Sequence, residues 1–133
     1  MVGVDGFRYV YRETVRFRDV DAMGHLNNAV FNTFMETARI AWLMDSGAID
    51  GLDGLSMIIA RTEVDFRSPV GYRDAVEIGA KVSRFGTKSF DMEFNFEVDG
   101  RLVAEGKTVC VAYDYEKGVT VPIPERWRQR LAA

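Results

Sequence analysis

Apolar and polar residues alternate over residues 9 to 18. Tyr9, Val15 and Phe17 fall on one side of an extended chain, and only Glu13 interrupts the apolar side. An apolar repeat with a period of two is typical of a strand with one buried face. The first predicted element is therefore a β-strand over residues 9 to 18.

The next apolar stretch, residues 29 to 47, has a different period. Its apolar residues recur every three to four positions, as expected for about five turns of helix at roughly 3.6 residues per turn. They are Val30, Phe31, Phe34, Met35, Ala38, Ala41 and Trp42. Asn27 or Asn28 is suited to cap the start of this helix, and Gly47 is suited to end it.

Alternation returns in the second half of the chain. Strands are predicted over residues 62–66, 76–82, 90–98 and 101–113. The pair Asp99-Gly100 is a strong hairpin signal and joins the last two of these strands, and another turn is expected over residues 84–89. A short amphipathic helix opened by Pro124 is predicted at the end of the sequence.

This order of elements predicts an α+β fold in one domain over residues 1–133. Strands do not alternate with helices, as a parallel sheet would require. An apolar helix followed by a meander buries its surface best when the sheet curls around it. Each hairpin also leaves an open strand edge, which favours pairing with a second subunit.

The composition of the chain limits the classes of molecule that it is expected to bind. The 133 residues carry a formal charge of −3 and the pI is near 5.2, which argues against duplex nucleic acid or an anionic membrane surface. The single cysteine, Cys110, has no partner for an internal disulfide, and one histidine, His25, gives no Cys/His zinc cluster. With no export signal or membrane segment in evidence, we expect a cytoplasmic protein.

Two common classes of site are excluded. There is no G-x-S-x-G motif for a serine hydrolase and no G-x-G-x-x-G motif for a dinucleotide. The segment over residues 100–108, "GRLVAEGKT", resembles a phosphate loop, but it has five residues between its glycines and lies within a predicted strand. We therefore expect no nucleotide-binding loop there.

The stretch "DVDAMGHLNN", residues 19 to 28, lies between the first strand and the long helix. In one interpretation it is an ordinary loop, whose Asp, Asn and Gly residues supply turns and caps. In the other it is an active site, because unpaired N–H groups at a helix start can polarise a carbonyl group. An aspartate just upstream can then act as nucleophile or general base, which is sufficient for acyl transfer.

The segment "VRFRDVDAMGHLNNAVFNTFMETAR", residues 15 to 39, resembles the signature of the 4-hydroxybenzoyl-CoA thioesterase-like (4HBT-like) family of hotdog-fold acyl-CoA thioesterases. The residues that match its D-x-D-x-x-G-H-x-N-N core are Asp19, Asp21, Gly24, His25, Asn27 and Asn28. The resemblance implies a hotdog fold, in which a curved antiparallel sheet of five to six strands wraps around the long helix. It also implies a homodimer, often a homotetramer, that hydrolyses acyl-CoA or acyl-carrier-protein thioesters without metal or cofactor.

The resemblance assigns catalysis to the loop and the start of the helix. Asp21 matches the catalytic aspartate, as nucleophile or general base, and the backbone N–H near Asn28 would polarise the thioester carbonyl. His25, Asn27 and Gly24 would shape the loop or contact the substrate. Asp19 is interpreted as a loop or capping residue.

Further candidates lie outside the loop. Glu36 is about two turns beyond Asn28 and can reach a partner's loop. Arg67 and Ser68 occupy positions that often line the pocket in this family. In the family, a turn at the subunit interface can hold a CoA phosphate, and the corresponding turn of this chain carries Arg84, Thr87, Lys88 and Ser89. Each of these also has a simpler explanation as a polar surface residue.

Two other functions stay open at this stage. A hydratase or dehydratase acting on acyl thioesters would use the same fold, but its D-x-N-P-x-H pattern is absent. A non-catalytic acyl-CoA-binding protein would also fit, although no additional DNA-binding segment is present. The identity of the acyl group is not predicted.

Overall fold

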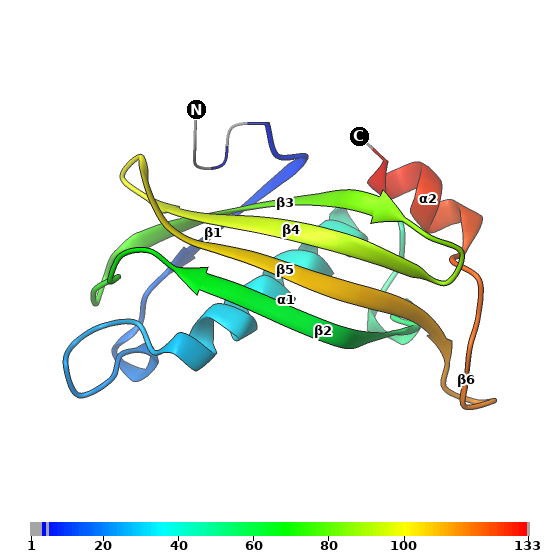
Figure 1. Cartoon of the computed structure of the whole chain (residues 1–133), viewed down its shortest axis with the longest axis horizontal. Coiled ribbons are helices and arrows are strands. Elements are labelled where there is room, and N and C mark those ends of the chain that lie inside the picture. The colour runs from blue at the N-terminus through cyan, green and yellow to red at the C-terminus, as the bar shows by residue number, and fades with distance from the viewer. Residues whose placement is uncertain (1–3, 5, 133) are drawn as a thin grey trace.

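A six-stranded antiparallel sheet, with one long helix across one of its faces, makes up most of the molecule (Figure 1). The structure is a computed structural model that describes Val4 and residues 6–132. Its strands are β1 (Tyr9–Thr14), β2 (Met57–Phe66), β3 (Ala75–Phe85), β4 (Ser89–Val98), β5 (Arg101–Asp114) and β6 (Val119–Thr120). Its α-helices are α1 (Asn28–Asp45) and α2 (Glu125–Leu131), and short 3-10 turns span Phe17–Asp19 and Leu52–Gly54.

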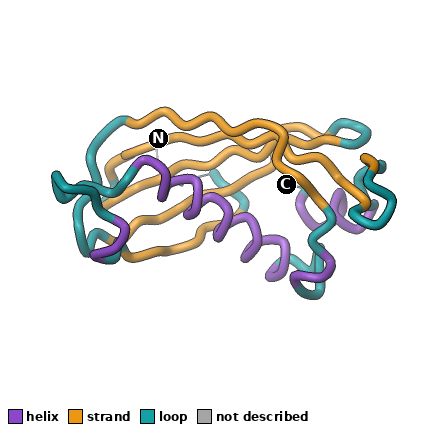
Figure 2. The backbone as a smooth tube through the Cα atoms, turned by 90° about the horizontal axis from the view of Figure 1, so that it is seen from below, coloured by secondary structure: helices purple, strands orange, loops and turns teal. Residues whose placement is uncertain are grey.

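The strand order is β1-β3-β4-β5-β2, with the short β6 paired to β5. Figure 2 shows α1 running along the same face of all the long strands. The predicted α+β hotdog architecture, a curled sheet around one long helix, is confirmed. The strand β2 has β5 on one side only, so it forms an edge of the sheet within the described residues.

The core lies between α1 and the sheet. Alternate residues of β4, from Phe90 to Phe96, are completely buried, because successive side chains of a strand point to opposite faces. The ring of Phe31 on α1 meets that of Phe96 edge to face, with centroids 5.2 Å apart. On β5, Gly106 lies directly beneath Met35, so the absence of a Cβ lets the helix approach the sheet.

The first strand is shorter than predicted. It ends at Thr14, and Phe17 belongs to a 3-10 turn with 77% of its surface exposed. The backbone of Val15 still bonds to Asp74 and Arg73, but the next amide, of Arg16, is captured by the carboxylate of Asp19. This local capture turns the chain away from the sheet, so the predicted strand over residues 9 to 18 was four residues too long.

Helix and hairpin boundaries agree with the sequence. Asn27 is the N-cap of α1, since its side chain accepts a hydrogen bond from the amide of Ala29. Gly47, with φ of +80°, follows the helix end. Asp99 and Gly100 both have positive φ, as a tight two-residue hairpin requires. Pro124 caps α2, as predicted.

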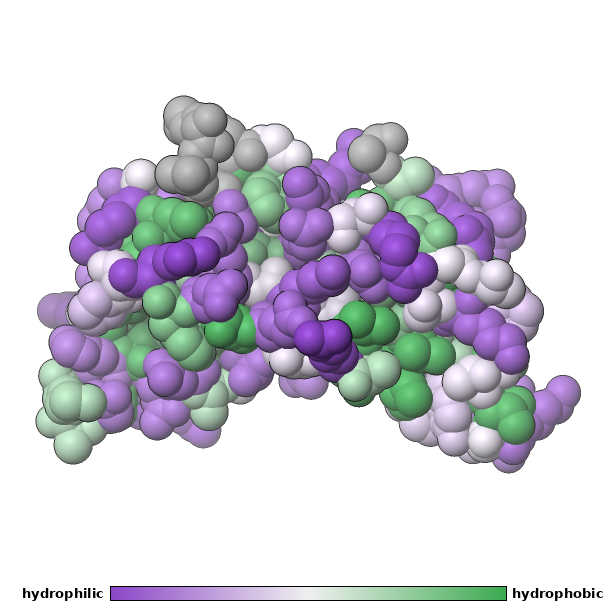
Figure 3. All heavy atoms as spheres, viewed as in Figure 1, coloured by the Kyte–Doolittle hydropathy of each residue, from purple (hydrophilic) through white to green (hydrophobic). Residues whose placement is uncertain are grey.

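The face of the sheet away from α1 is mostly hydrophilic, with smaller apolar patches (Figure 3). This is the expected surface of an antiparallel sheet that packs a helix on one side only. None of the helices in the described part of the chain is long and apolar enough to span a membrane. The expectation that no export signal is present concerns in part residues 1–3 and 5, which lie outside the described residues.

Candidate active site

The loop between β1 and α1 is held at its base by Asp19. This side chain is only 3% exposed, and its carboxylate accepts hydrogen bonds from the backbone amide and the guanidinium of Arg16. Burial favours a raised pKa for Asp19, but the Arg16 contacts outweigh it and lower the pKa below its usual value. The carbonyl of Asp19 accepts from the amide of Asn27, so the loop closes on the first turn of α1.

Asp21 is fixed by the loop that it begins. Its Oδ1 accepts the backbone N–H groups of Met23, at 2.9 Å, and His25, at 3.2 Å. Its own amide donates to the carbonyl of His25, and its carbonyl accepts from Gly24, whose φ is +78°. Among the described residues, the second carboxylate oxygen, Oδ2, has no hydrogen-bond partner and is therefore available to a ligand.

A second segment closes the site from the far side. The amide of Leu26 donates to the carbonyl of Val70 at 2.6 Å, and His25 forms a β-bridge with Gly71. The loop is thereby joined to the segment that follows β2. This pairing brings residues from two distant parts of the sequence to the same cavity.

The cavity has a volume of about 480 Å³ and lies at the start of α1. It is lined by Asp21, Met23, His25, Leu26, Asn27, Asn28, Phe31, Phe66, Arg67, Ser68, Pro69 and Val70. Carboxylate, imidazole and amide groups occupy one side, and aromatic and aliphatic side chains occupy the other. A ligand with a polar reacting group and an apolar body suits this lining.

The start of α1 offers an unused donor to this cavity. Asn27 receives Ala29 N–H on its side chain and Val30 N–H on its carbonyl oxygen. The N–H of Asn28, the first helical residue, has no acceptor within the described part of the chain. It lies at the positive end of the helix dipole, where a developing negative charge is stabilised.

Six predicted site residues meet in the cavity and others lie elsewhere. Arg67 lines it, but its guanidinium donates twice to Glu105, at 3.0 and 2.7 Å. Gly24 belongs to the loop without lining the cavity. Glu36 borders a different hollow, between α1 and the start of β2.

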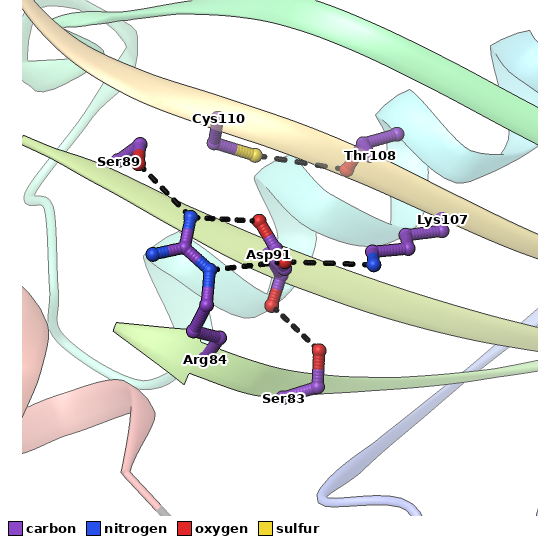
Figure 4. Close-up of polar contacts among 7 residues, drawn as sticks. All are labelled: Ser83, Arg84, Ser89, Asp91, Lys107, Thr108 and Cys110. Atoms are coloured by element: carbon purple, nitrogen blue, oxygen red, sulfur yellow. Dashed lines mark hydrogen bonds and ion pairs between the residues drawn. The ribbon is translucent and has the colours of Figure 1, made fainter. Parts of the chain in front are cut away.

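The predicted phosphate-binding turn lies at the other end of the sheet, between β3 and β4. Figure 4 shows that Arg84 is engaged there by Asp91 and Ser89, while Lys107 also reaches Asp91. The amino group of Lys88 lies 3.4 Å from the hydroxyl of Thr120. Within one chain, this turn does not share the cavity of Asp21.

Several apolar members of the cavity, Phe66 and Val70 among them, were not predicted as site residues. Phe66 reads in the sequence as a strand end, and its ring packs edge to face against Phe31 at 5.1 Å. Val70 also lines the cavity, and its carbonyl accepts a backbone hydrogen bond from Leu26. No local pattern carries this information, because both contacts are long-range.

Arg39 is a further residue that the helical pattern missed. It lies four residues after Met35 and three before Trp42, on the apolar side of α1, and it is 6% exposed. This position on the apolar side of the helix was the sequence signal that could have identified Arg39 as a buried residue. No group of three or more His, Cys, Asp or Glu residues suited to a metal is present in the residues that the structure describes.

Comparison with known proteins places this site in context. The sequence model of the family described as "Thioesterase-like superfamily" matches residues 15–131. The chain is 38% identical to a Thermus thermophilus thioesterase whose crystal structure contains coenzyme A and Zn. That match covers 96% of this chain and 94% of the other, with a TM-score of 0.85.

Two further relatives have named substrates. The chain is 22% identical over 121 residues to the long-chain acyl-CoA thioesterase FadM of Escherichia coli K12, covering 88% of this chain and 92% of that protein. It is 26% identical to the gentisyl-coenzyme A thioesterase BH1999, with a TM-score of 0.83 over 93% of this chain and all of the other.

Proposed function

Because the chain belongs to the thioesterase-like superfamily and is a thioester hydrolase, we propose that it hydrolyses acyl-CoA to a free acid and CoA, with Asp21 as the catalytic carboxylate. The observation that carries this assignment is the pairing of Asp21 and the unused Asn28 N–H in one cavity. The bound coenzyme A of the Thermus relative supports CoA as the thiol. Family membership favours hydrolysis over the hydratase and the non-catalytic binding protein.

In the proposed reaction the thioester carbonyl oxygen accepts a hydrogen bond from Asn28 N–H. The helix dipole strengthens this polarisation, and loss of one such donor typically costs about 2.7 to 4 kcal/mol of transition-state stabilisation. The carbonyl carbon then lies within reach of the free Oδ2 of Asp21. His25, Asn27 and Ser68 border the reacting group, and Phe31 and Phe66 contact the acyl body.

Two routes satisfy this arrangement. In the first, Oδ2 of Asp21 bonds to the carbonyl carbon, the C–S bond breaks, CoA leaves as the thiolate, and water then hydrolyses the mixed anhydride. In the second, Oδ2 removes a proton from water as the water oxygen attacks, and the departing thiolate takes up a proton. Single turnover in ¹⁸O-water separates them, because only the first route places label in the Asp21 carboxylate.

We further propose a homodimer formed through the free edge of β2. Ile59 and Phe66 on this strand are 38% and 46% exposed, which is unusual for apolar residues on the helix side of a sheet. A two-fold axis at Thr62 pairs β2 with β2 of a second copy in antiparallel register. The strand β2 has a bulge between Ile59 and Arg61, which shifts the alternation of its side chains by one residue. In this register, residues from the same face of the sheet therefore lie opposite each other.

That register is complementary in both apolarity and charge. On the helix side, Val64 meets Ile59 of the partner subunit and Phe66 meets Met57 of the partner subunit. On the outer side, Arg61 forms an ion pair with Glu63 of its own chain, and in this register it also lies opposite Glu63 of the partner subunit, twice by symmetry. The turn over residues 84–89 lies at the end of the sheet where β2 begins. The proposed two-fold axis brings this end of one subunit close to the Asp21 cavity of the other. This placement supports the turn as a contact for CoA phosphates, and a tetramer of two such dimers remains a prediction.

The activity is tested by thiol release from a panel of acyl-CoA substrates. Purified protein is expected to release CoA from at least one of them. Asp21→Asn should lower kcat by about a thousandfold, within the range for loss of a positioned acid–base group, while its amide oxygen still accepts the two loop N–H bonds and keeps the fold. Asp53→Asn, an exposed aspartate distant from the cavity, is the matched control. Full turnover in Asp21→Asn would refute the assignment.

A further inference from the structure

Arg39 is a buried cation without a hydrogen-bonding partner. Its side chain projects from the apolar side of α1 and is 6% exposed, and no hydrogen bond or ion pair within 4 Å involves it among the described residues. Burial lowers the pKa of Arg39, and the nearby Cys110 and then Glu36 oppose this effect, neither of them through a hydrogen bond or ion pair. An unpaired charge in a largely apolar setting is strongly destabilising unless an anion approaches it.

The guanidinium borders a hollow of about 330 Å³ between α1 and the start of β2. The walls include the carboxylate-bearing Glu36, which makes no ion pair with Arg39, and the apolar Ile40, Met57 and Ile59. Tyr115 completes them, and its hydroxyl donates to the carbonyl of Met57 at 2.8 Å. Every fully buried side-chain nitrogen or oxygen in the described residues has a hydrogen-bond partner. The nitrogens of Arg39 have none, so they are not fully buried and reach open space at this hollow.

The proposed two-fold axis places this hollow next to the partner's active-site cavity. Residues Met57 and Ile59, which line the hollow, are paired with Phe66 and Val64 of the partner subunit. Phe66 also lines the cavity of Asp21. An acyl group whose thioester lies at Asp21 of one subunit would therefore extend past Phe66 toward Arg39 of the other.

The partner's β2 supplies no anion for Arg39. Its helix-side residues near the hollow are Val64 and Phe66, whereas Glu63 and Asp65 point to the outer face, since successive strand residues alternate. A carboxylate on the ligand fits this gap, because the planar guanidinium binds a carboxylate through two parallel hydrogen bonds.

We infer, on the basis of the proposed function, that the preferred substrates are CoA thioesters of acyl groups with an apolar body and a carboxylate at the far end. Arg39 of the partner subunit binds this terminal carboxylate. The two ends of such an acyl group need different environments. Asp21 and Asn28 N–H act on the thioester, aromatic side chains contact the body, and Arg39 binds the terminal carboxylate.

The test compares monothioesters of dicarboxylic acids, from succinyl-CoA to sebacyl-CoA, with neutral acyl-CoAs of matched length. The wild-type enzyme should show a kcat/KM ratio of dicarboxylic to neutral substrate of about ten to a hundred at the best length, the range for a hydrogen bond to a charged group. In Arg39→Met the ratio should fall toward one, and in Arg39→Lys it should be intermediate. Arg12→Met, an exposed arginine on β1, should leave it unchanged.

A wild-type ratio near one, or a ratio that Arg39→Met leaves unaltered, would overturn the inference. The second result would show that Arg39 acts on all substrates alike, through the reacting centre or the subunit interface. If Arg39→Met does not fold, the wild-type ratio and that of Arg39→Lys decide. Calorimetric binding of suberyl-CoA and nonanoyl-CoA to Asp21→Asn gives the same comparison without turnover, so failure of the hydrolysis proposal is distinguishable from failure of this one.

Discussion

The backbone N–H of Asn27 donates to the backbone carbonyl of Asp19 over 2.9 Å, and this bond joins the start of α1 to the base of the loop over residues 19–28. Asp19 is itself bound by Arg16, and Asn27 caps the helix whose first residue, Asn28, lines the cavity of Asp21. The position of the proposed oxyanion donor therefore depends on two residues that do not react. Both can be tested separately from catalysis.

Asp19→Asn should lower the free energy of unfolding by about 1 to 3 kcal/mol at neutral pH, because a buried charge-assisted contact to Arg16 is lost. The folded-state pKa of Asp19 is lowered. Its contribution is therefore complete above the unfolded value of roughly 3.9 and is lost as the pH falls through the lower folded value. Urea denaturation from pH 7 to pH 2 should show the wild-type and Asp19→Asn stabilities converging at the acid end. A constant gap at all pH values would contradict the role of the carboxylate charge, and Asp53→Asn serves as the control.

Asn27→Ala should destabilise the protein by about 1 kcal/mol, since loss of a side-chain N-cap typically costs about 0.5 to 2 kcal/mol. Asn27→Ser keeps an oxygen for Ala29 N–H and should cost much less. Denaturant unfolding measures both variants, and kcat on one acyl-CoA reports whether the helix start remains in place. Equal stability of the two variants would show that the Asn27 side chain does not act as a cap.

Gly106→Ala should destabilise the fold by about 1 to 3 kcal/mol, the usual cost of overpacking a core. The new Cβ would overlap the Sδ atom of Met35 on α1. In a Met35→Ala background the same substitution should cost less, with a coupling energy of about 0.5 to 3 kcal/mol. Thermal and urea unfolding of the four proteins complete the cycle, and strict additivity would mean that the two residues are not in contact.

Arg61→Glu should weaken the dimer, because in the proposed register it places a second carboxylate opposite Glu63 of the partner subunit. Two pairs, each worth roughly 0.2 to 1 kcal/mol, change from attraction to repulsion, which implies a rise of about fourfold to several hundredfold in the dimer Kd. Sedimentation equilibrium should detect twice the 15.0 kDa chain mass for the wild type and dissociation of the variant on dilution. The double change Arg61→Glu with Glu63→Arg should restore association. A double variant no tighter than the single one would exclude this register.

Local sequence patterns were sufficient for most of the elements. The alternation in residues 90–98, the pair Asp99-Gly100 and the apolar spacing of residues 29 to 47 act over distances of a few residues, so period and turn chemistry determine them. The same is true of the Asn27 cap and of the loop that Asp21 closes on itself, since every bond involved is within four residues.

Tertiary structure decided what those elements enclose. The far wall of the cavity depends on the bond from Leu26 to Val70. The end of β1, in contrast, is set locally, because Asp19 captures the amide of Arg16. Arg39 is buried beside the start of β2, and its position on the apolar side of α1 is the local sign that distinguishes it from a solvent-exposed arginine. Contacts between distant segments depend on the packing of the whole sheet and helix. The sequence by itself therefore determined the elements and the loop over residues 19–28, and only the fold determined the cavity at the start of α1 and the burial of Arg39.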